Sequence, residues 1–167
     1  MRITAKPFLA LTAEDLMSPV VITIPQSMSL PGAARLMRRA AISGAPVVDA
    51  EGRCVGVISA TDFVSWAVQC DWSAKRQAAA PACFHSPWQI PEAEALPNDE
   101  VGRFMTVDAV TTGPETPIGE LARIMVDAHI HRIIVVDAPG RPIGVVSSTD
   151  VLAAVTRLAQ QQRAEVG

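Results

Sequence analysis

The chain has few cysteines and no long apolar run. Its three cysteines, Cys54, Cys70 and Cys83, are odd in number and far apart, which argues against a disulfide framework and for a reducing compartment. No apolar stretch approaches the length of a membrane span, and the N-terminal residues reach Glu14 and Asp15 too soon for a secretory signal. We therefore expect a cytoplasmic protein.

Positive charge is also scarce, and arginine carries most of it. The chain has two lysines among 14 basic residues and a formal net charge of −3. No basic surface is available to attract nucleic acid, so an anion site must be local and built from arginine, histidine or backbone amides. The phosphate-loop, nucleophile-elbow, zinc-protease and paired-cysteine motifs are absent as well. We expect no catalytic activity.

What the sequence does contain is an internal repeat. Residues 17–62 align without a gap with residues 105–150, at a constant offset of 105 − 17 = 88 positions. The helix, hairpin and helix-start signals stay in register, so the chain holds two copies of one supersecondary unit. Its 167 residues, 49% of them hydrophobic, suffice to bury a core. Function should lie between the copies or in what they jointly present.

Each copy is predicted to form a strand, a helix, two strands and a second helix. In the first copy, residues 20–24 are a β-branched run, and Ser29 is placed to cap a helix over residues 30–41. In the second copy, Thr116 is the expected N-cap and Pro117 the expected first helical residue. The apolar residues at helical spacing that should face the core are Ile118, Leu121, Ala122 and Met125.

Two apolar strands around an Asp-x-x-Gly turn follow each helix, a pattern typical of a hairpin. The turns at Asp49 and Asp137 should lie at the surface. In each copy the first of two glycines suits the turn, and the second, Gly56 or Gly144, permits close approach of a ligand or a neighbouring strand. The last helix is expected to fray after Leu158.

The segment between the copies breaks the pattern. It is rich in proline and has no sustained period, which predicts an ordered crossing segment with a flexible alanine-rich stretch near residues 78–82. Trp72, Phe84 and Trp88 are expected to pin this segment onto the repeats.

The repeated core, a Val-Val-Asp turn followed by a Gly-Val-[Ile/Val]-Ser-x-Thr-Asp run, resembles the CBS domain. The two copies together resemble a CBS-domain pair, or Bateman module, of the standalone bacterial type. The resemblance implies an α+β fold of two β-α-β-β-α repeats packed with pseudo-twofold symmetry, with clefts that take AMP, ADP, ATP, SAM or NAD. We place an N-terminal extension at residues 1–10, the CBS domains at 11–68 and 99–158, a linker at 69–98 and a tail at 159–167.

The resemblance also implies site residues. The aspartate of the family motif binds the ribose hydroxyls and the serine lies near the phosphate or ribose, which selects Ser59 with Asp62 and Ser147 with Asp150. A carboxylate can accept two hydrogen bonds from a vicinal diol. The same aspartates would also stabilise a helix N-terminus without any ligand.

Two further sets of residues are candidates. His131 and Arg132 resemble the phosphate-binding pair in the gamma subunit of AMP-activated protein kinase, and the first copy lacks both, so the two clefts should be unequal. Alternatively, Arg132 pairs with a surface carboxylate and His131 is simply exposed. Thr23 and Thr111 occupy a position that often contacts base or phosphate in the family, although strand residues need no ligand to explain them.

The other polar residues are not expected to bind a ligand. Arg35 and Arg123 point away from the apolar stripe of their helices, as solvated or interface charges do. A metal site from Cys70, Cys83 and the histidines lacks paired spacing, so we expect no bound metal, even though His129 and His131 could face one side of an extended segment.

Two hypotheses follow. In the first, the protein is a regulatory module that binds an adenosine nucleotide and modulates a separate partner protein. In the second, it is a ligand-independent assembly module. Both predict a homodimer, because small side chains on the Ala/Met-rich helices allow close helix approach.

Overall fold

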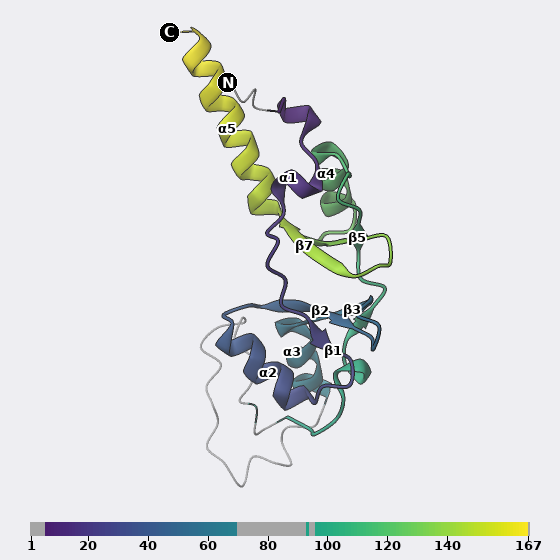
Figure 1. Ribbon diagram of the computed structural model, residues 1–167. Helices are drawn as coiled ribbons and strands as arrows, with labels where there is room; N and C mark the ends of the chain where they lie inside the picture. Colours follow the sequence, from purple (N-terminus) through teal and green to yellow (C-terminus); the bar gives the residue numbers. More distant parts are fainter. Residues whose placement is uncertain (1–5, 70–92, 94–95, 167) are drawn as a thin grey trace. The chain divides into compact units, whose positions relative to one another are not determined.

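The computed structural model of the chain describes residues 6–69, 93 and 96–166. The chain divides into two compact units, one formed by residues 22–109 and the other by residues 1–21 together with 110–167. Each unit combines a small sheet with helices (Figure 1). The predicted α+β fold with two repeats is therefore confirmed.

The unit of residues 22–109 contains a four-stranded sheet with the order β1-β2-β3-β4. Strand β1 is parallel to β2, whereas β2 and β3 form an antiparallel hairpin and β4 adds antiparallel to β3. The elements are β1 (Ile24–Pro25), α2 (Leu30–Arg39), β2 (Gly44–Val48), β3 (Cys54–Ser59), α3 (Ala60–Gln69), the 3-10 turn η3 (Val101–Arg103) and β4 (Thr106–Val107).

The other unit repeats this arrangement with a sheet of order β5-β6-β7. An isolated antiparallel bridge between Ser18 and Val145 pairs with β7 at the position where β4 pairs with β3 in the other unit. The elements are η1 (Phe8–Ala10), α1 (Ala13–Leu16), β5 (Thr111–Thr112), α4 (Ile118–Asp127), β6 (Arg132–Val136), β7 (Pro142–Ser147) and α5 (Ser148–Val166). Within the described residues, no helix is long and apolar enough to cross a membrane.

Each unit is completed by the segment that precedes the other repeat. The first amide of α2, at Leu30, donates to the carbonyl of Asp99, and the first amide of α4, at Ile118, donates to the carbonyl of Leu11, both at 2.8 Å. The two donors are 88 residues apart and so are the two acceptors, so both bonds follow the sequence repeat. We call the segment before each repeat, which packs in the unit of the other repeat, the exchanged segment. Distant backbone therefore satisfies helix-terminal amides that have no partner within their own helix.

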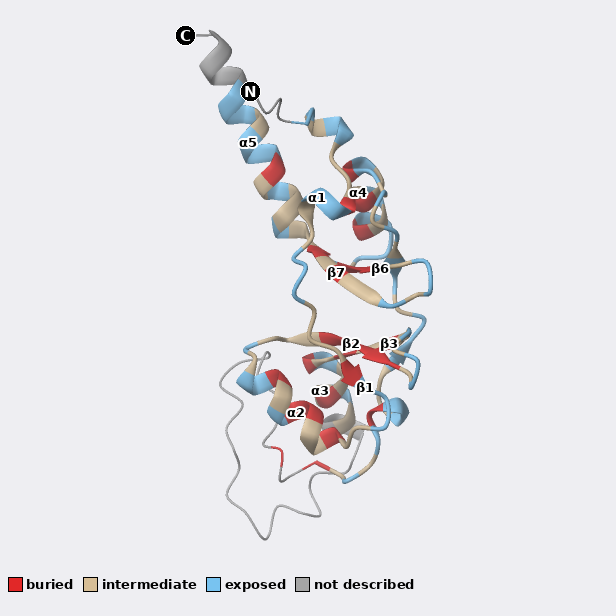
Figure 2. Cartoon of the chain, viewed as in Figure 1, coloured by how far each residue is buried: buried red, intermediate tan, exposed pale blue. Residues whose placement is uncertain are grey.

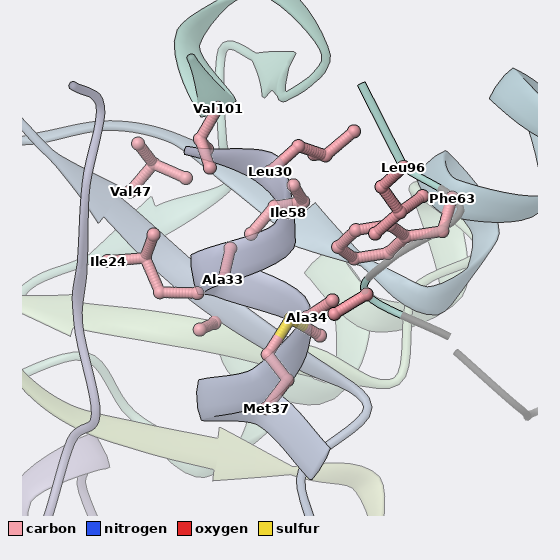
Figure 3. Packing of buried hydrophobic residues seen from close by; sticks show 12 residues of the cluster. Ile24, Leu30, Ala33, Ala34, Met37, Val47, Ile58, Phe63, Leu96 and Val101 are labelled. Carbon is pink, nitrogen blue, oxygen red and sulfur yellow. The ribbon is translucent and has the colours of Figure 1, made fainter. Parts of the chain in front are cut away.

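Helix α2 packs its apolar face on the first sheet. The hydroxyl of Ser29 caps the helix by accepting from the amide of Gly32 at 3.3 Å, as predicted. The core cluster is drawn in Figure 3, and its labelled members are Ile24, Leu30, Ala33, Ala34, Met37, Val47, Ile58, Phe63, Leu96 and Val101. Figure 2 shows the buried residues of this unit on the facing sides of α2, α3 and the sheet. In α4, the predicted core residues Ile118, Leu121 and Met125 are likewise buried, and Ala122 is half-buried.

The two predicted hairpins are confirmed. The carboxylate of Asp49 accepts from the amide of Arg53 at 2.8 Å, and that of Asp137 accepts from the amide of Arg141 at 2.7 Å. The turn glycines Gly52 and Gly140 have φ values of 80° and 88°, a region that favours glycine. The turn tips are exposed at residues 50–51 and 138–139.

The second glycine of each copy lies against the exchanged segment. A Cβ at Gly56 would lie 2.6 Å from the carbonyl oxygen of Thr106 in β4, and a Cβ at Gly144 would overlap the sulfur of Met17. The predicted close approach is therefore to a neighbouring segment of the same chain. Only a residue without a side chain leaves room for that segment.

Three local predictions were wrong. The strand expected at residues 20–24 begins only at Ile24, and Val20 is 85% exposed, because Ser18 has paired with β7 and Pro19 cannot donate to a ladder. Pro117, not Thr116, occupies the N-cap position of α4, and the Thr116 hydroxyl accepts from the hydroxyl of Thr112 at 2.6 Å. Helix α5 continues past Leu158 to Val166.

Several sequence predictions lie outside the described residues. These are the flexible stretch at 78–82, the anchoring roles of Trp72, Phe84 and Trp88, and the states of Cys70 and Cys83. At the end of this segment, Ala93 and Leu96 are buried in the core of the first unit. Cys54 is described and carries a free thiol.

The close contacts of Gly56 and Gly144 predict that alanine at either position destabilises the fold. We expect Gly56→Ala to cost about 1–3 kcal/mol, and Gly144→Ala somewhat less, because the Met17 side chain can yield more easily than the backbone of Thr106. Urea unfolding measures both. The matched control is Gly119→Ala in α4, where a Cβ meets nothing within 4 Å and should be neutral or slightly stabilising. Equal stability of all three variants would contradict the close packing.

The docking of the N-terminal segment predicts a pH dependence. The Lys6 ammonium, 2.6 Å away, and the Thr12 amide, 2.8 Å away, donate to the carboxylate of Asp15 and lower its pKa. A lowered pKa in the folded state gives stability that is present above the ordinary carboxyl pKa of about 3.9 and is lost as the pH falls through the folded value.

We expect Asp15→Asn to lower the free energy of unfolding by about 1 kcal/mol at pH 7, because the pair is solvent-screened and the capping box is partly lost. Urea unfolding of wild type and variant should show this gap closing below pH 4. Lys6→Met should lower the free energy of unfolding at pH 7 by part of the amount that Asp15→Asn does. A gap that is unchanged at pH 3 would show that the carboxylate does not contribute through its charge.

Candidate ligand-binding site

The two serine–aspartate pairs lie where a strand of each hairpin passes directly into a helix. Ser59 ends β3 before α3, and Ser147 ends β7 before α5. The amide and hydroxyl of Ser59 donate to Oδ2 of Asp62 at 2.7 and 2.8 Å. The same groups of Ser147 donate to Oδ2 of Asp150 at 2.8 and 2.6 Å. Each aspartate is thus held rigidly over the start of its helix.

These bonds to the aspartate are those of a capping box, and a capping box also begins α1, away from the predicted site. At α1, the amide and hydroxyl of Thr12 donate to Oδ2 of Asp15 at 2.8 and 2.9 Å. In the second repeat, the amide of Asp150 also donates back to the Ser147 hydroxyl at 3.3 Å. A cap of this kind stabilises a helix by about 1 kcal/mol. The structural role of these aspartates therefore exists without a ligand.

The second oxygen of each carboxylate distinguishes the repeats. Oδ1 of Asp62 accepts from the hydroxyl of Thr106 in β4 at 3.0 Å. The counterpart of Thr106 at the 88-residue offset is Ser18, and among the described residues Asp150 accepts only from Ser147. Sequence reasoning did not select Thr106, although the repeat alignment pairs it with another hydroxyl residue.

In the second repeat, register places the predicted residues on one face of the sheet. Arg132 in β6 lies opposite Ser147 in β7, and Thr111 in β5 pairs with Ile134, two positions along the strand from Arg132. Because side chains alternate along a strand and Ile133 points into the core, Arg132 and Thr111 point away from it. Arg132 and Thr111 are exposed, and Ser147 is half-buried.

His131 contributes through its backbone. Its carbonyl accepts from the first amide of α5, at Ser148, at 2.9 Å, and its side chain is exposed. Two amides at the start of α5, those of Ser148 and Asp150, therefore already donate within the protein. The guanidinium of Arg132 is the charged group on this face that can bind an anion in a bidentate manner.

The first repeat has a barer face. Gly44 lies opposite Ser59 in the register position of Arg132, so this position carries no side chain. The carbonyl of Ser43 accepts from the amide of Ala60 at 2.9 Å, as that of His131 does from Ser148. Thr23 lies one residue before β1 and is half-buried. At the register position opposite the serine, the second repeat has an arginine and the first has a glycine, and the inequality of the two clefts stays a prediction.

The remaining polar candidates lie apart from this face. Arg35 is exposed on α2, and Arg123 is exposed on α4, where it pairs with Glu120 and with Asp127, the latter at 3.0 Å. His129 has a φ of 54° immediately after α4, so the extended segment that was to align it with His131 is not formed. Among the described residues, no three His, Cys, Asp or Glu side chains group as metal ligands.

The sequence matches a known protein family and is similar to known proteins. The family model of the CBS domain matches residues 13–69 and 101–157, more than half of the chain. The uncharacterized protein MJ1426 of Methanocaldococcus jannaschii is 31% identical over 133 residues, which cover 72% of this chain and 77% of that protein. Homoserine O-acetyltransferase of Methanohalobium evestigatum is 28% identical over 82% of this chain, but the match spans only 22% of that enzyme.

Solved structures agree. The CBS domain of a CBS domain containing membrane protein from Sphaerobacter thermophilus is 30% identical, with a TM-score of 0.63 over 88% of this chain and 89% of that one. The cytosolic domain of the Mg²⁺ channel MgtE in complex with ATP is 28% identical, with a TM-score of 0.63 over 85% of this chain and 48% of that one. The chain therefore belongs to the CBS-domain family, and it carries two CBS domains as a CBS-domain pair.

Proposed function

We propose that the protein is a regulatory module that binds an adenosine nucleotide and transmits its presence to a separate partner protein. The observation that carries the proposal is that Arg132 lies opposite Ser147 in the strand ladder while Ser147 holds the carboxylate of Asp150. AMP, ADP and ATP are the ligands that this face suits best, and SAM and NAD share the adenosine moiety. The proposal includes a cytoplasmic location and no chemical step.

The chemistry of the face fits such a ligand. A carboxylate offers about four acceptor positions, and Ser147 occupies two of them on Oδ2 of Asp150. Oδ1 can then accept from both hydroxyls of a ribose. Arg132, across the ladder from Ser147, would bind phosphate through its fork of N–H donors, with His131 beside it as a further donor. Thr111 lies along the same face and would contact the base or phosphate.

Similarity supports the same ligand class. The cytosolic domain of MgtE, solved with ATP, shares 28% identity with this chain over the compared region. This likeness supports an adenosine nucleotide in general. The preference among nucleotides rests on Arg132 and His131, which favour a ligand with phosphate groups over an uncharged nucleoside.

An assembly role is the second candidate, and one observation favours it. Helices α4 and α5 expose apolar side chains, with Val126 at 72%, Leu152 at 64% and Val155 at 45% of their surface accessible. Exposed apolar residues on helices are typical of protein contacts. A homodimer, as predicted from the helix composition, fits both candidates, so ligand binding is what separates them.

Removing one charge at the ribose position tests the proposal. At a concentration 100 times its dissociation constant, a nucleotide should stabilise the wild-type protein by about 2.7 kcal/mol, which raises the melting temperature by several degrees. We expect Asp150→Asn to abolish this shift in a thermal scan with AMP, ADP, ATP, SAM and NAD. Asp15→Asn, which removes the same charge from the same kind of capping box, should keep it. A folded, dimeric wild type that no nucleotide stabilises would favour the assembly role.

The phosphate role of Arg132 predicts a selective loss. Arg132→Gln should weaken ATP binding about tenfold or more, because a charge-assisted contact is worth roughly 1.5–3 kcal/mol, and should leave adenosine binding unchanged. Isothermal titration with ATP and with adenosine measures both. Arg123→Gln on α4 is the control for loss of an exposed arginine and should change neither. Equal weakening of ATP and adenosine would assign Arg132 to the fold rather than to phosphate.

A further inference from the structure

We infer that the chain fills its own first-repeat ribose position with the hydroxyl of Thr106, so that the protein binds one adenosine ligand per chain, in the second repeat. This inference rests on the proposed function and deepens it. It depends on how many acceptor positions each aspartate keeps for a ligand.

The acceptor count differs between the repeats. In both, the serine amide and hydroxyl occupy two positions on Oδ2. Thr106 occupies a third position of Asp62 from 3.0 Å, on Oδ1. Of about four positions, Asp150 therefore keeps two and Asp62 keeps one. A ribose diol has two hydroxyls to donate, so only Asp150 can accept both without losing a bond that it already makes.

The backbone explains why Thr106 reaches its aspartate. Thr106 belongs to a two-residue strand, in which Thr106 and Val107 pair with Val57 and Gly56 of β3. Its counterpart Ser18 makes a single bridge with Val145 and precedes Pro19, which has no amide to continue the ladder. The exchanged segment thus follows the neighbouring strand further in the first unit than in the second.

A second observation points the same way. Opposite Ser59, where the second repeat has Arg132, the first repeat has Gly44. A phosphate at this position would meet no guanidinium, so a nucleotide would not recover there what it loses by displacing Thr106. The first repeat therefore lacks the second acceptor position on Asp62 that a diol needs, and its strand residue opposite Ser59 carries no side chain for a phosphate.

Isothermal titration of the full chain with adenosine and with ATP tests the inference, and adenosine carries the diol without a phosphate. We expect one site per chain in the wild type, lost in Asp150→Asn and retained in Asp62→Asn. Thr106→Val removes the hydroxyl and keeps a strand-forming shape; it should open a second adenosine site and raise the titrated stoichiometry from one to two ligands per chain. Ser18→Ala is the matched control and should behave as the wild type.

The outcomes separate the inference from the proposed function. Two equal sites in the wild type, loss of binding in Asp62→Asn, or an unchanged single site in Thr106→Val would overturn the inference and leave nucleotide binding standing. Absence of binding of ATP and adenosine to every variant, with the proteins folded by circular dichroism, would overturn the proposed function itself.

Discussion

Each unit depends on the exchanged segment, the stretch of chain that precedes the other repeat. The first amides of α2 and α4 donate to Asp99 and Leu11, residues far away in the sequence, and glycines at 56 and 144 leave the space in which the exchanged segments lie. Helix α2 has a side-chain cap from Ser29 in addition to this bond, whereas α4 begins after Pro117 with the backbone bond and no side-chain cap. Neither repeat can complete its unit from its own contiguous residues.

At the candidate site, one side chain can likewise serve both the fold and a ligand. Asp62 and Asp150 cap helices that follow directly from the hairpins, so their carboxylates are fixed before any ligand arrives. Preorganisation of this kind reduces the entropy lost on binding. It also means that a substitution at either aspartate acts on stability and on binding together, and the capping box at Asp15 is the reference that separates the two effects.

Much of the fold could be predicted from local patterns. The hairpins followed from Asp-x-x-Gly turns, and the core face of α4 followed from apolar spacing, because both depend on neighbours within a few residues. The strand at 20–24 failed because pairing of Ser18 with β7 decides where the chain becomes extended. The cap at Thr116 failed because Leu11 supplies the missing acceptor and the Thr116 hydroxyl bonds Thr112 instead. These partners lie too far along the chain for a local pattern to reveal.

The sequence by itself determined the family, the twofold repeat and the serine–aspartate pairs, since these follow from the order of residues along the chain, but it did not select Thr106. Tertiary structure alone decided which residues share a face and how many acceptor positions each aspartate keeps. Arg132 lies opposite Ser147 through strand register, and Thr106 bonds Asp62 across 44 residues through strand pairing. Two repeats that read alike therefore differ in chemistry, because hydrogen bonds between distant segments depend on where the backbone lies and not on the order of residues.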